Sequence, residues 1–361
     1  MNAEDRLICA LTRHDFQDEH RSLVLRLCRP DIRWDRVLVT ARQHGVAPLV
    51  CWNLDRIPAG ASGIDDAVLM TFRLMREANR VAKRMQSEQI AELVSELKRR
   101  GIDVMLVKGA AMDLSVYDAP WYTVSADVDL ILRRHRADLS PQERSDIWTL
   151  LASHPNVEWD LFQHHDVNMN GVLTIDFERI WNEASPVPLA GCEVFIMRPE
   201  DMLIAACINS CRKRFFRLKS LCDIRAVIAK YPAIDWDKVC ERAREYRCSR
   251  IVYTALWVTQ VTLGCDVPPN VLGRFGVGTF RKTIIQNIGH RFGFCFQPSI
   301  DSGMKIFGKT VGLSAVLPYL TCSFPHPGKM LSTLLGELRR TRVDEHQSVR
   351  KDQISDDIVR I

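Results

Sequence analysis

The stretch Val104-Met-Leu-Val-Lys-Gly-Ala-Ala-Met112, followed by Ser125-Ala-Asp-Val-Asp-Leu-Ile-Leu132, decides the fold. The first part has the pattern of a buried strand that ends at Gly109 and passes directly into a helix. The second predicts a strand whose side chains alternate between two faces, so Asp127 and Asp129 project from the same face. Two adjacent carboxylates repel each other unless a cation lies between them, and Mg²⁺ carrying a nucleoside triphosphate suits such oxygen ligands.

A third carboxylate belongs to the stretch Val172-Leu-Thr-Ile-Asp-Phe-Glu-Arg-Ile180. Its alternating pattern predicts a strand with apolar residues on one face and Thr174, Asp176 and Glu178 on the other. If this strand joins the same sheet, Asp176 completes a three-carboxylate site that is able to hold two Mg²⁺ ions. The first strand ends in Lys108-Gly109-Ala110-Ala111 and enters a helix, whose free backbone N–H groups and dipole favour a phosphate.

The rest of the chain predicts helices on both sides of this α/β segment. Proline and glycine are absent from Asp65 to Arg100, where apolar residues recur at helical spacing, so we expect one long helix or two with a soft joint. We predict five segments: an N-terminal helical region (1–60), a long helix leading into the core (61–101), an α/β core (102–197), a C-terminal helical domain (198–340) and a charged tail (341–361).

The composition is that of an ordinary globular protein, with 47% hydrophobic and 26% charged residues in 361. A net charge of +5 permits anionic substrates without demanding nucleic acid. The twelve cysteines are scattered without a Cys-x-x-Cys pair, which is typical of reduced, buried thiols. The N-terminus lacks a signal-peptide pattern, and the most apolar C-terminal run (311–324) contains a proline and is too short to span a bilayer. We therefore predict a cytoplasmic protein without a membrane partner.

Five motifs, in this order and spacing, resemble the uncharacterised nucleotidyltransferase family of the DNA polymerase β superfamily. The resemblance runs from about residue 20 to about residue 265. It implies an α+β fold, in which a small mixed sheet forms a nucleotidyltransferase core embedded between N-terminal and C-terminal helical regions. The motifs are Leu106-Val-Lys-Gly-Ala-Ala111, Asp127-Val-Asp-Leu-Ile-Leu132, Ile175-Asp-Phe-Glu178, Arg198-Pro-Glu-Asp-Met-Leu203 and Leu221-Cys-Asp-Ile224.

The resemblance also implies a reaction: transfer of a nucleoside monophosphate, most simply AMP from ATP, to a hydroxyl group with release of pyrophosphate. Asp127, Asp129 and Asp176 are the implied metal ligands and catalytic residues, for two Mg²⁺ ions. The acceptor is a small molecule, a peptide or protein, or an RNA end. The implied nucleotide-binding residues are Lys108, Gly109, Ala110, Arg214 and Arg217, the last two within a basic cluster with Arg212, Lys213 and Lys219 that also suits a solvated helix end.

Several accessory positions depart from the family pattern. Thr123 stands where an arginine is usual, Ala126 replaces a serine, and Ala110 replaces the serine of the superfamily's Gly-Ser. Glu178 and Arg179 stand where the family has histidine and tryptophan. Two alternatives follow: a catalytically weakened relative that binds nucleotides or partners, and an enzyme that adds nucleotides to tRNA. The modest net charge makes the tRNA reading less attractive.

Four further sequence features each allow a functional or a structural interpretation. Glu178 is either a general base or a solvent-facing residue. Asp223 is either an accessory site residue or a polar group of the core. Trp121 and Tyr122 either stack on a base or anchor their loop. The trio His164-His165-Asp166 fits a structural or rim position better than a metal site, because adjacent residues of an extended chain face opposite ways.

Overall fold

The computed structural model describes residues 1–292 except 59, 126, 134–138, 155–157, 162–172, 214 and 216, and also residues 304–306 and 309–311. The chain divides into two compact units, one comprising Met1–Gly276 and another that begins at Val277. The second unit contains α15 (Thr279–Phe292), β6 (Met304–Ile306) and β7 (Lys309–Val311). The five-segment division predicted from the sequence is finer and stays a prediction.

The first unit opens with four short helices: α1 (Ala3–Leu11), α2 (Asp18–Leu27), α3 (Trp34–Gln43) and α4 (Ala47–Leu54). The sequence predicts helices over 5–11, 19–28 and 34–44, and α1, α2 and α3 confirm them. It also predicts that Gly45 and Pro48 close the third helix, so α4 is not expected from the sequence. Pro48 instead lies in the first turn of α4, where the missing N–H of proline costs nothing.

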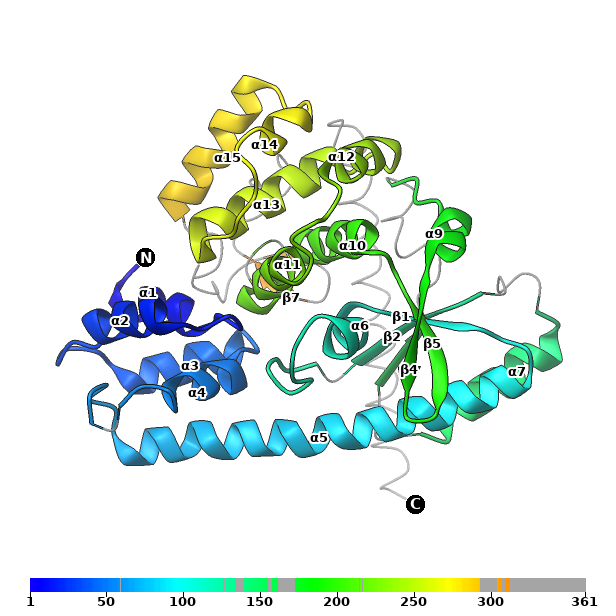
Figure 1. Ribbon diagram of the computed structural model, residues 1–361, viewed down its shortest axis with the longest axis horizontal. Helices are drawn as coiled ribbons and strands as arrows, with labels where there is room; N and C mark the ends of the chain where they lie inside the picture. The colour runs from blue at the N-terminus through cyan, green and yellow to red at the C-terminus, as the bar shows by residue number, and fades with distance from the viewer. Residues whose placement is uncertain are drawn as a thin grey trace, which may run out of the picture. The chain divides into compact units, whose positions relative to one another are not determined.

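The long helix α5 (Asp66–Arg99) runs without interruption beneath α3, α4 and the sheet (Figure 1). The Asp65 carboxylate accepts the Ala67 N–H at 2.8 Å to start it, and Gly101 follows its end with a left-handed φ of 72°. The predicted apolar stripe is confirmed at Phe72, Ile90, Leu93, Val94 and Leu97, which are buried. Ala82 and Met85 fall at the same helical spacing but are exposed.

A five-stranded mixed sheet follows, in the order β3-β2-β1-β5-β4. Central β1 (Val104–Val107) pairs antiparallel with β2 (Asp127–Leu132) and parallel with β5 (Cys192–Ile196). The outer strands are β3 (Glu158–Leu161), parallel to β2, and β4 (Ser185–Leu189), antiparallel to β5. β4 was not predicted, since it contains two prolines, which are tolerated at an edge. α6 (Lys108–Ser115) follows β1, and α7 (Pro141–Ala152) follows β2.

The predicted strand over 172–180 is wrong for its described residues. Residues 173–176 belong to no strand, and α9 (Phe177–Glu183) begins directly after them. The reason is that the Asp176 carboxylate accepts the Arg179 N–H at 3.0 Å and caps the helix. The expected alternation still holds, because Leu173 and Phe177 are buried while Asp176 is exposed. The sequence also predicts a strand over 166–170 and a hairpin at Asn170-Gly171. Both lie outside the described residues, as does the trio His164-His165-Asp166.

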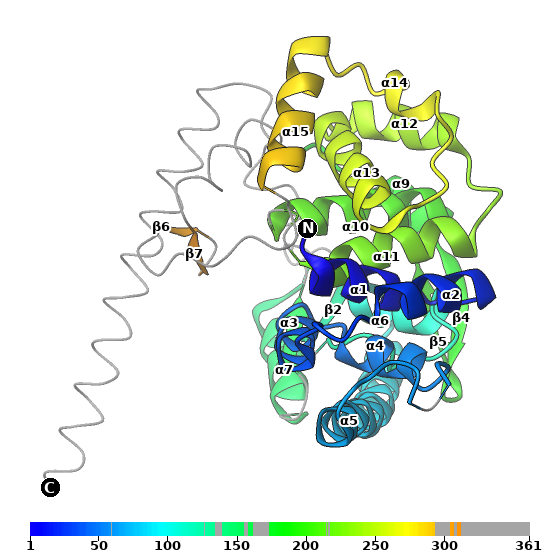
Figure 2. The same cartoon turned by 90° about the vertical axis from the view of Figure 1, so that its left-hand side faces the viewer.

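Helices α10 (Pro199–Arg212), α11 (Leu218–Lys230), α12 (Trp236–Glu245), α13 (Ser249–Leu263) and α14 (Val271–Arg274) complete the first unit. α10 packs against α6, α11, α12 and α13 (Figure 2). The sequence predicts Asp235 as the N-cap of a helix over 236–246, and its carboxylate accepts two backbone N–H groups at the start of α12. The predicted α+β class, a small mixed sheet among helices, is therefore confirmed. None of the helices in the described ranges combines the length and hydropathy needed to cross a bilayer.

Candidate active site

The junction between β1 and α6 places Lys108 beside the aspartate strand. Lys108 adopts a left-handed φ of 50°, unusual for a residue with a side chain, at the point where the strand turns into the helix. The register pairs Val107 with Asp129, and the Lys108 Nζ donates to the Asp129 carboxylate. Asp129 is buried with only 3% of its surface exposed, so this ammonium partner supplies the compensation that a buried carboxylate requires.

Asp127, two residues earlier on β2, is exposed. Burial of part of its carboxyl group would raise its pKa, but its own backbone N–H, the Lys108 charge, the Ser125 hydroxyl and the Lys213 charge together lower the pKa below the usual value. The Ser125 Oγ donates to the Asp127 Oδ1 at 3.2 Å. Asp127 is therefore an accessible and ionised carboxylate at neutral pH.

Gly109 and Ala110 form the first turn of α6, the end at which backbone N–H groups lack partners within the helix. Neither residue has a polar side chain, so their backbone N–H groups are all that they offer a phosphate. A Cβ built on Gly109 would come within 2.6 Å of the Ser125 Oγ, which explains why glycine occupies this position. Ser125 also brings a hydroxyl to this helix start, where Ala110 has lost one.

Asp176 lies apart from the aspartate strand in its contacts, since its carboxylate caps α9. Among the described residues, no three His, Cys, Asp or Glu side chains are gathered closely enough to hold a metal ion. The fit to Mg²⁺ in this structure therefore rests on Asp127 and Asp129 as a pair of hard oxygen ligands. Asp176 as a third ligand stays a prediction. The strand register also aligns Asp129 with Asp160 of β3.

The members of the basic cluster (Arg212, Lys213, Arg214, Arg217 and Lys219) have different surroundings in the structure. Lys213 acts on Asp127 through its charge, as noted above, so the C-terminal end of α10 lies near the aspartate strand. Lys219 is buried and its Nζ donates to Asp223 at 2.8 Å, which removes it from the candidate phosphate ligands. Arg217 lies against Gly45, where a Cβ would be 3.3 Å from its guanidinium. Arg214 lies outside the described residues, and its predicted role, like that of Arg217, stays a prediction.

The contacts of Asp223 are those of a polar group in the core, and the contacts of Trp121 and Tyr122 are those of residues that anchor a loop. The buried Asp223 carboxylate accepts the Tyr117 hydroxyl at 2.7 Å in addition to Lys219. Trp121 and Tyr122 pack edge-on to each other, with ring centroids 5.1 Å apart, and both pack against Trp52. Thr123 is buried, and its carbonyl accepts the Asn79 amide at 3.3 Å. Glu178 is exposed in the first turn of α9.

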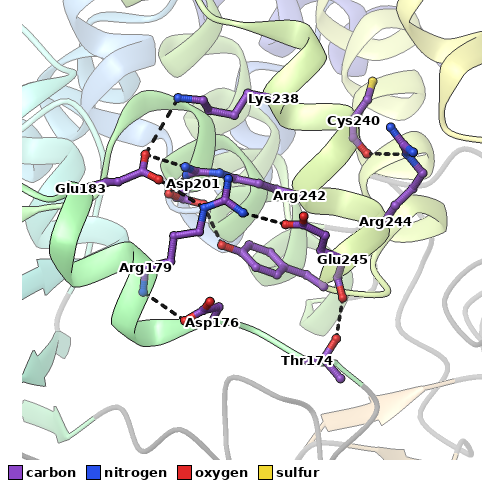
Figure 3. A network of polar contacts seen from close by, with 11 residues as sticks. Thr174, Asp176, Arg179, Glu183, Asp201, Lys238, Cys240, Arg242, Arg244 and Glu245 are labelled. Carbon is purple, nitrogen blue, oxygen red and sulfur yellow. Dashed lines mark hydrogen bonds and ion pairs between the residues drawn. The ribbon is translucent and has the colours of Figure 1, made fainter.

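The motif Arg198–Leu203 has a structural explanation (Figure 3). The Asp201 carboxylate binds the fully buried Arg242 of α12 and accepts the Tyr246 hydroxyl at 3.3 Å. The neighbouring Glu200 accepts the Asp235 backbone N–H at 3.1 Å, at the start of α12. The two acids of the motif therefore fasten α10 to α12.

Sequence reasoning missed Asn209, which with Arg212 lines a pocket beside Lys108. Ile175 and Phe177, the residues on either side of Asp176, also line this pocket. Asn209 lies one helical turn after Ala205, which lines the same pocket, and three residues before Arg212. This spacing along α10 is the signal that would have identified it.

A strand that ends at a lysine–glycine helix start, beside an Asp-x-Asp strand, defines an α/β core suited to phosphorylated ligands. The model of the uncharacterised nucleotidyltransferase family matches residues 30–142 and 156–264, and the chain belongs to this family. A solved structure titled an antigenic nucleotidyltransferase-like protein from Paracoccidioides brasiliensis is similar at 18% identity, over 56% of this chain and 91% of that chain, with a TM-score of 0.35. No curated protein matches the chain significantly. The predicted resemblance is confirmed, and the family supports nucleotidyl transfer and a nucleotide substrate.

Proposed function

We propose that the protein transfers a nucleoside monophosphate, most simply AMP from ATP, to an acceptor hydroxyl in a Mg²⁺-dependent reaction. The observation that carries this proposal is the accessible, ionised Asp127 next to Asp129 and Lys108, at the start of α6. Carboxylate oxygens and an ammonium group meet there, beside backbone N–H groups that suit phosphate oxygens.

Each residue has a role in this proposal. Lys108 and the N–H groups of Gly109 and Ala110 bind the triphosphate and stabilise the charge that gathers on the departing pyrophosphate. Asp127 and Asp129 are the ligands for Mg²⁺, which when bound neutralises phosphate charge and lowers the pKa of the acceptor hydroxyl. The acceptor oxygen forms a bond to the α-phosphorus as the bond to the bridging oxygen of pyrophosphate breaks. Glu178 is the proposed acceptor of the hydroxyl proton.

The test is release of pyrophosphate from each nucleoside triphosphate with Mg²⁺ and a panel of hydroxyl acceptors. We expect Asp127→Asn to abolish release, because it removes an accessible charge while leaving the Lys108–Asp129 pair intact. Glu88→Gln, the same chemical change on an exposed face of α5, is the control. Identical traces for the wild type and Asp127→Asn with every nucleotide and acceptor would exclude the enzymatic function.

The role of Asp176 needs a variant that separates ligation from capping. Serine caps helices nearly as well as aspartate but carries no charge. We expect Asp176→Ser to keep the melting temperature and lose pyrophosphate release, if Asp176 ligates a metal. Asp235→Ser makes the matched change at the cap of α12. If Asp176→Ser lost stability but kept its activity, Asp176 would be a helix cap and not a metal ligand.

The two alternatives predict different results in the same assay. A binding-only relative retains a triphosphate in the presence of Mg²⁺ without releasing pyrophosphate. An enzyme acting on tRNA releases pyrophosphate only when RNA is supplied, and labelled nucleotide then appears on the RNA.

A further inference from the structure

The pocket beside Lys108 has mostly apolar walls with a few polar lining residues. Val107, Ile204, Ile208 and Met197 contribute aliphatic surface. Lys108, at the start of α6, and Asn209, on α10, also line it. The same two residues line a neighbouring pocket. Lys108 and Asn209 therefore border the same apolar space.

Asn209 carries hydrogen-bonding capacity that the described part of the chain does not use. Its side-chain amide makes no hydrogen bond with any residue in the described part of the chain, and the residue is half-buried. An amide has an oxygen that accepts and an NH₂ group that donates. A polar group between apolar walls without a partner costs free energy, which a ligand with a matching donor and acceptor recovers on binding.

We propose that this pocket binds the base of the nucleotide and that Asn209 selects adenine. This inference rests on the proposed function. The Asn209 oxygen accepts the 6-amino group of adenine and its NH₂ donates to the neighbouring ring nitrogen, a pairing that asparagine commonly makes. The aliphatic side chains pack on the two faces of the ring, while the phosphates lie at Lys108 and the start of α6.

Guanine and the pyrimidines fit less well. Guanine carries a 2-amino group and a ring N–H that need acceptors, and the carboxylate that lines the pocket, Asp201, is already bound by Arg242 and Tyr246. A buried amino group without an acceptor is costly. A pyrimidine is smaller and loses contact with the apolar walls. Adenine is the base whose polar edge Asn209 satisfies.

The experiment measures binding of the α,β-methylene analogues of ATP, GTP, CTP and UTP to the full chain with Mg²⁺. We expect the wild type to bind the adenine analogue about ten-fold more tightly than the others. Asn209→Asp removes the donor and supplies two acceptors, so the preference should shift from adenine towards guanine. Asn182→Asp makes the same change at an exposed position of α9 and should leave the preference unaltered.

A second variant protects the test against misfolding. Ala205→Phe fills the pocket and should weaken binding of the adenine analogue while sparing inorganic tripolyphosphate, which needs only Lys108, the start of α6 and the metal. An unchanged order of base preference in Asn209→Asp, or unchanged affinity in Ala205→Phe, overturns the assignment. So does an effect of both variants on the acceptor KM alone, which would make this the acceptor pocket.

The binding readout also separates this inference from the proposed function. Adenine-selective binding that depends on Asn209, without pyrophosphate release, supports the base pocket and refutes the transfer reaction. Pyrophosphate release with the same base preference in Asn209→Asp supports the reaction and refutes the base pocket.

Discussion

Ser125 and Gly109 approach each other so closely that a Cβ at position 109 would lie 2.6 Å from the Ser125 Oγ and 3.0 Å from its Cβ. This contact joins the start of α6 to the segment that leads into the aspartate strand. Because the same hydroxyl donates to Asp127, the proposed phosphate end and metal end of the site are held in register by one side chain.

Gly109→Ala should therefore damage the site more than the fold. The added methyl forces Ser125 and its segment away, at a cost of about 1–3 kcal/mol in unfolding free energy. We expect affinity for a triphosphate with Mg²⁺ to fall at least ten-fold by titration calorimetry. Gly273→Ala, where a Cβ meets nothing, is the control. Unchanged affinity in Gly109→Ala would mean that the contact does not position the site.

Arg242 is the centre of the polar network between α9, α10 and α12. Its guanidinium is fully buried, binds Asp201 and donates to the Glu183 carboxylate at 2.5 Å. Arg242→Met leaves Asp201 as a buried charge without its partner and should lower the unfolding free energy by about 3–5 kcal/mol. Arg244→Met, on the exposed side of the same helix, should change it by less than about 0.5 kcal/mol. Equal denaturation midpoints for the two variants would contradict this.

The local pattern of the sequence was enough to predict β1, β2 and the start of α6. In each of these short segments the hydrophobic period and the turn residues, such as Lys108-Gly109, predict the same element. The predicted strand around Asp176 is wrong because its local pattern does not decide the structure. Burial alternates over 173–176, but these residues pair with no strand in the described part of the chain. Strand pairing depends on distant residues that local periodicity does not report. An aspartate before an apolar residue also serves as a helix cap.

The contacts that support the site were beyond sequence reasoning because their partners come from distant elements. Asp223 of α11 binds Tyr117, which follows α6, and Asp113 of α6 binds Lys83 of α5. In the sequence, each of these four residues is typical of a surface charge or of a helix interior. Only the packing of the helices shows that these charges are buried together.

The link from α5 to the aspartate segment predicts a positioning role for Gln86. Its amide accepts the Lys83 ammonium at 3.0 Å and donates to the Ser125 carbonyl at 3.4 Å. Gln86→Leu should release Ser125 and lower kcat about ten-fold, with a change in KM below two-fold, since no contact with substrate is lost. The melting temperature should fall by only a few degrees. Gln142→Leu, on exposed α7, is the control, and a loss confined to KM would argue against positioning.

The buried pair of Lys83 and Asp113 gives a stability profile with a definite sign. Burial raises the pKa of Asp113 from 3.8 to about 6, although the Lys83 ammonium at 2.6 Å opposes the rise. A raised carboxyl pKa means that the folded state holds a proton that the unfolded state has released, so this contribution to stability is complete below pH 4 and is lost as the pH rises through about 6.

Asp113→Asn removes this titration, because asparagine resembles the protonated acid and cannot ionise. We expect urea denaturation to give equal stabilities for the variant and the wild type near pH 4. At pH 7 the variant should be the more stable, by on the order of 3 kcal/mol. Glu88→Gln, at an exposed position of α5, should show no such divergence. A less stable Asp113→Asn at pH 7 would show that the attraction of Lys83 outweighs the cost of burying the carboxylate, which reverses the sign of the contribution.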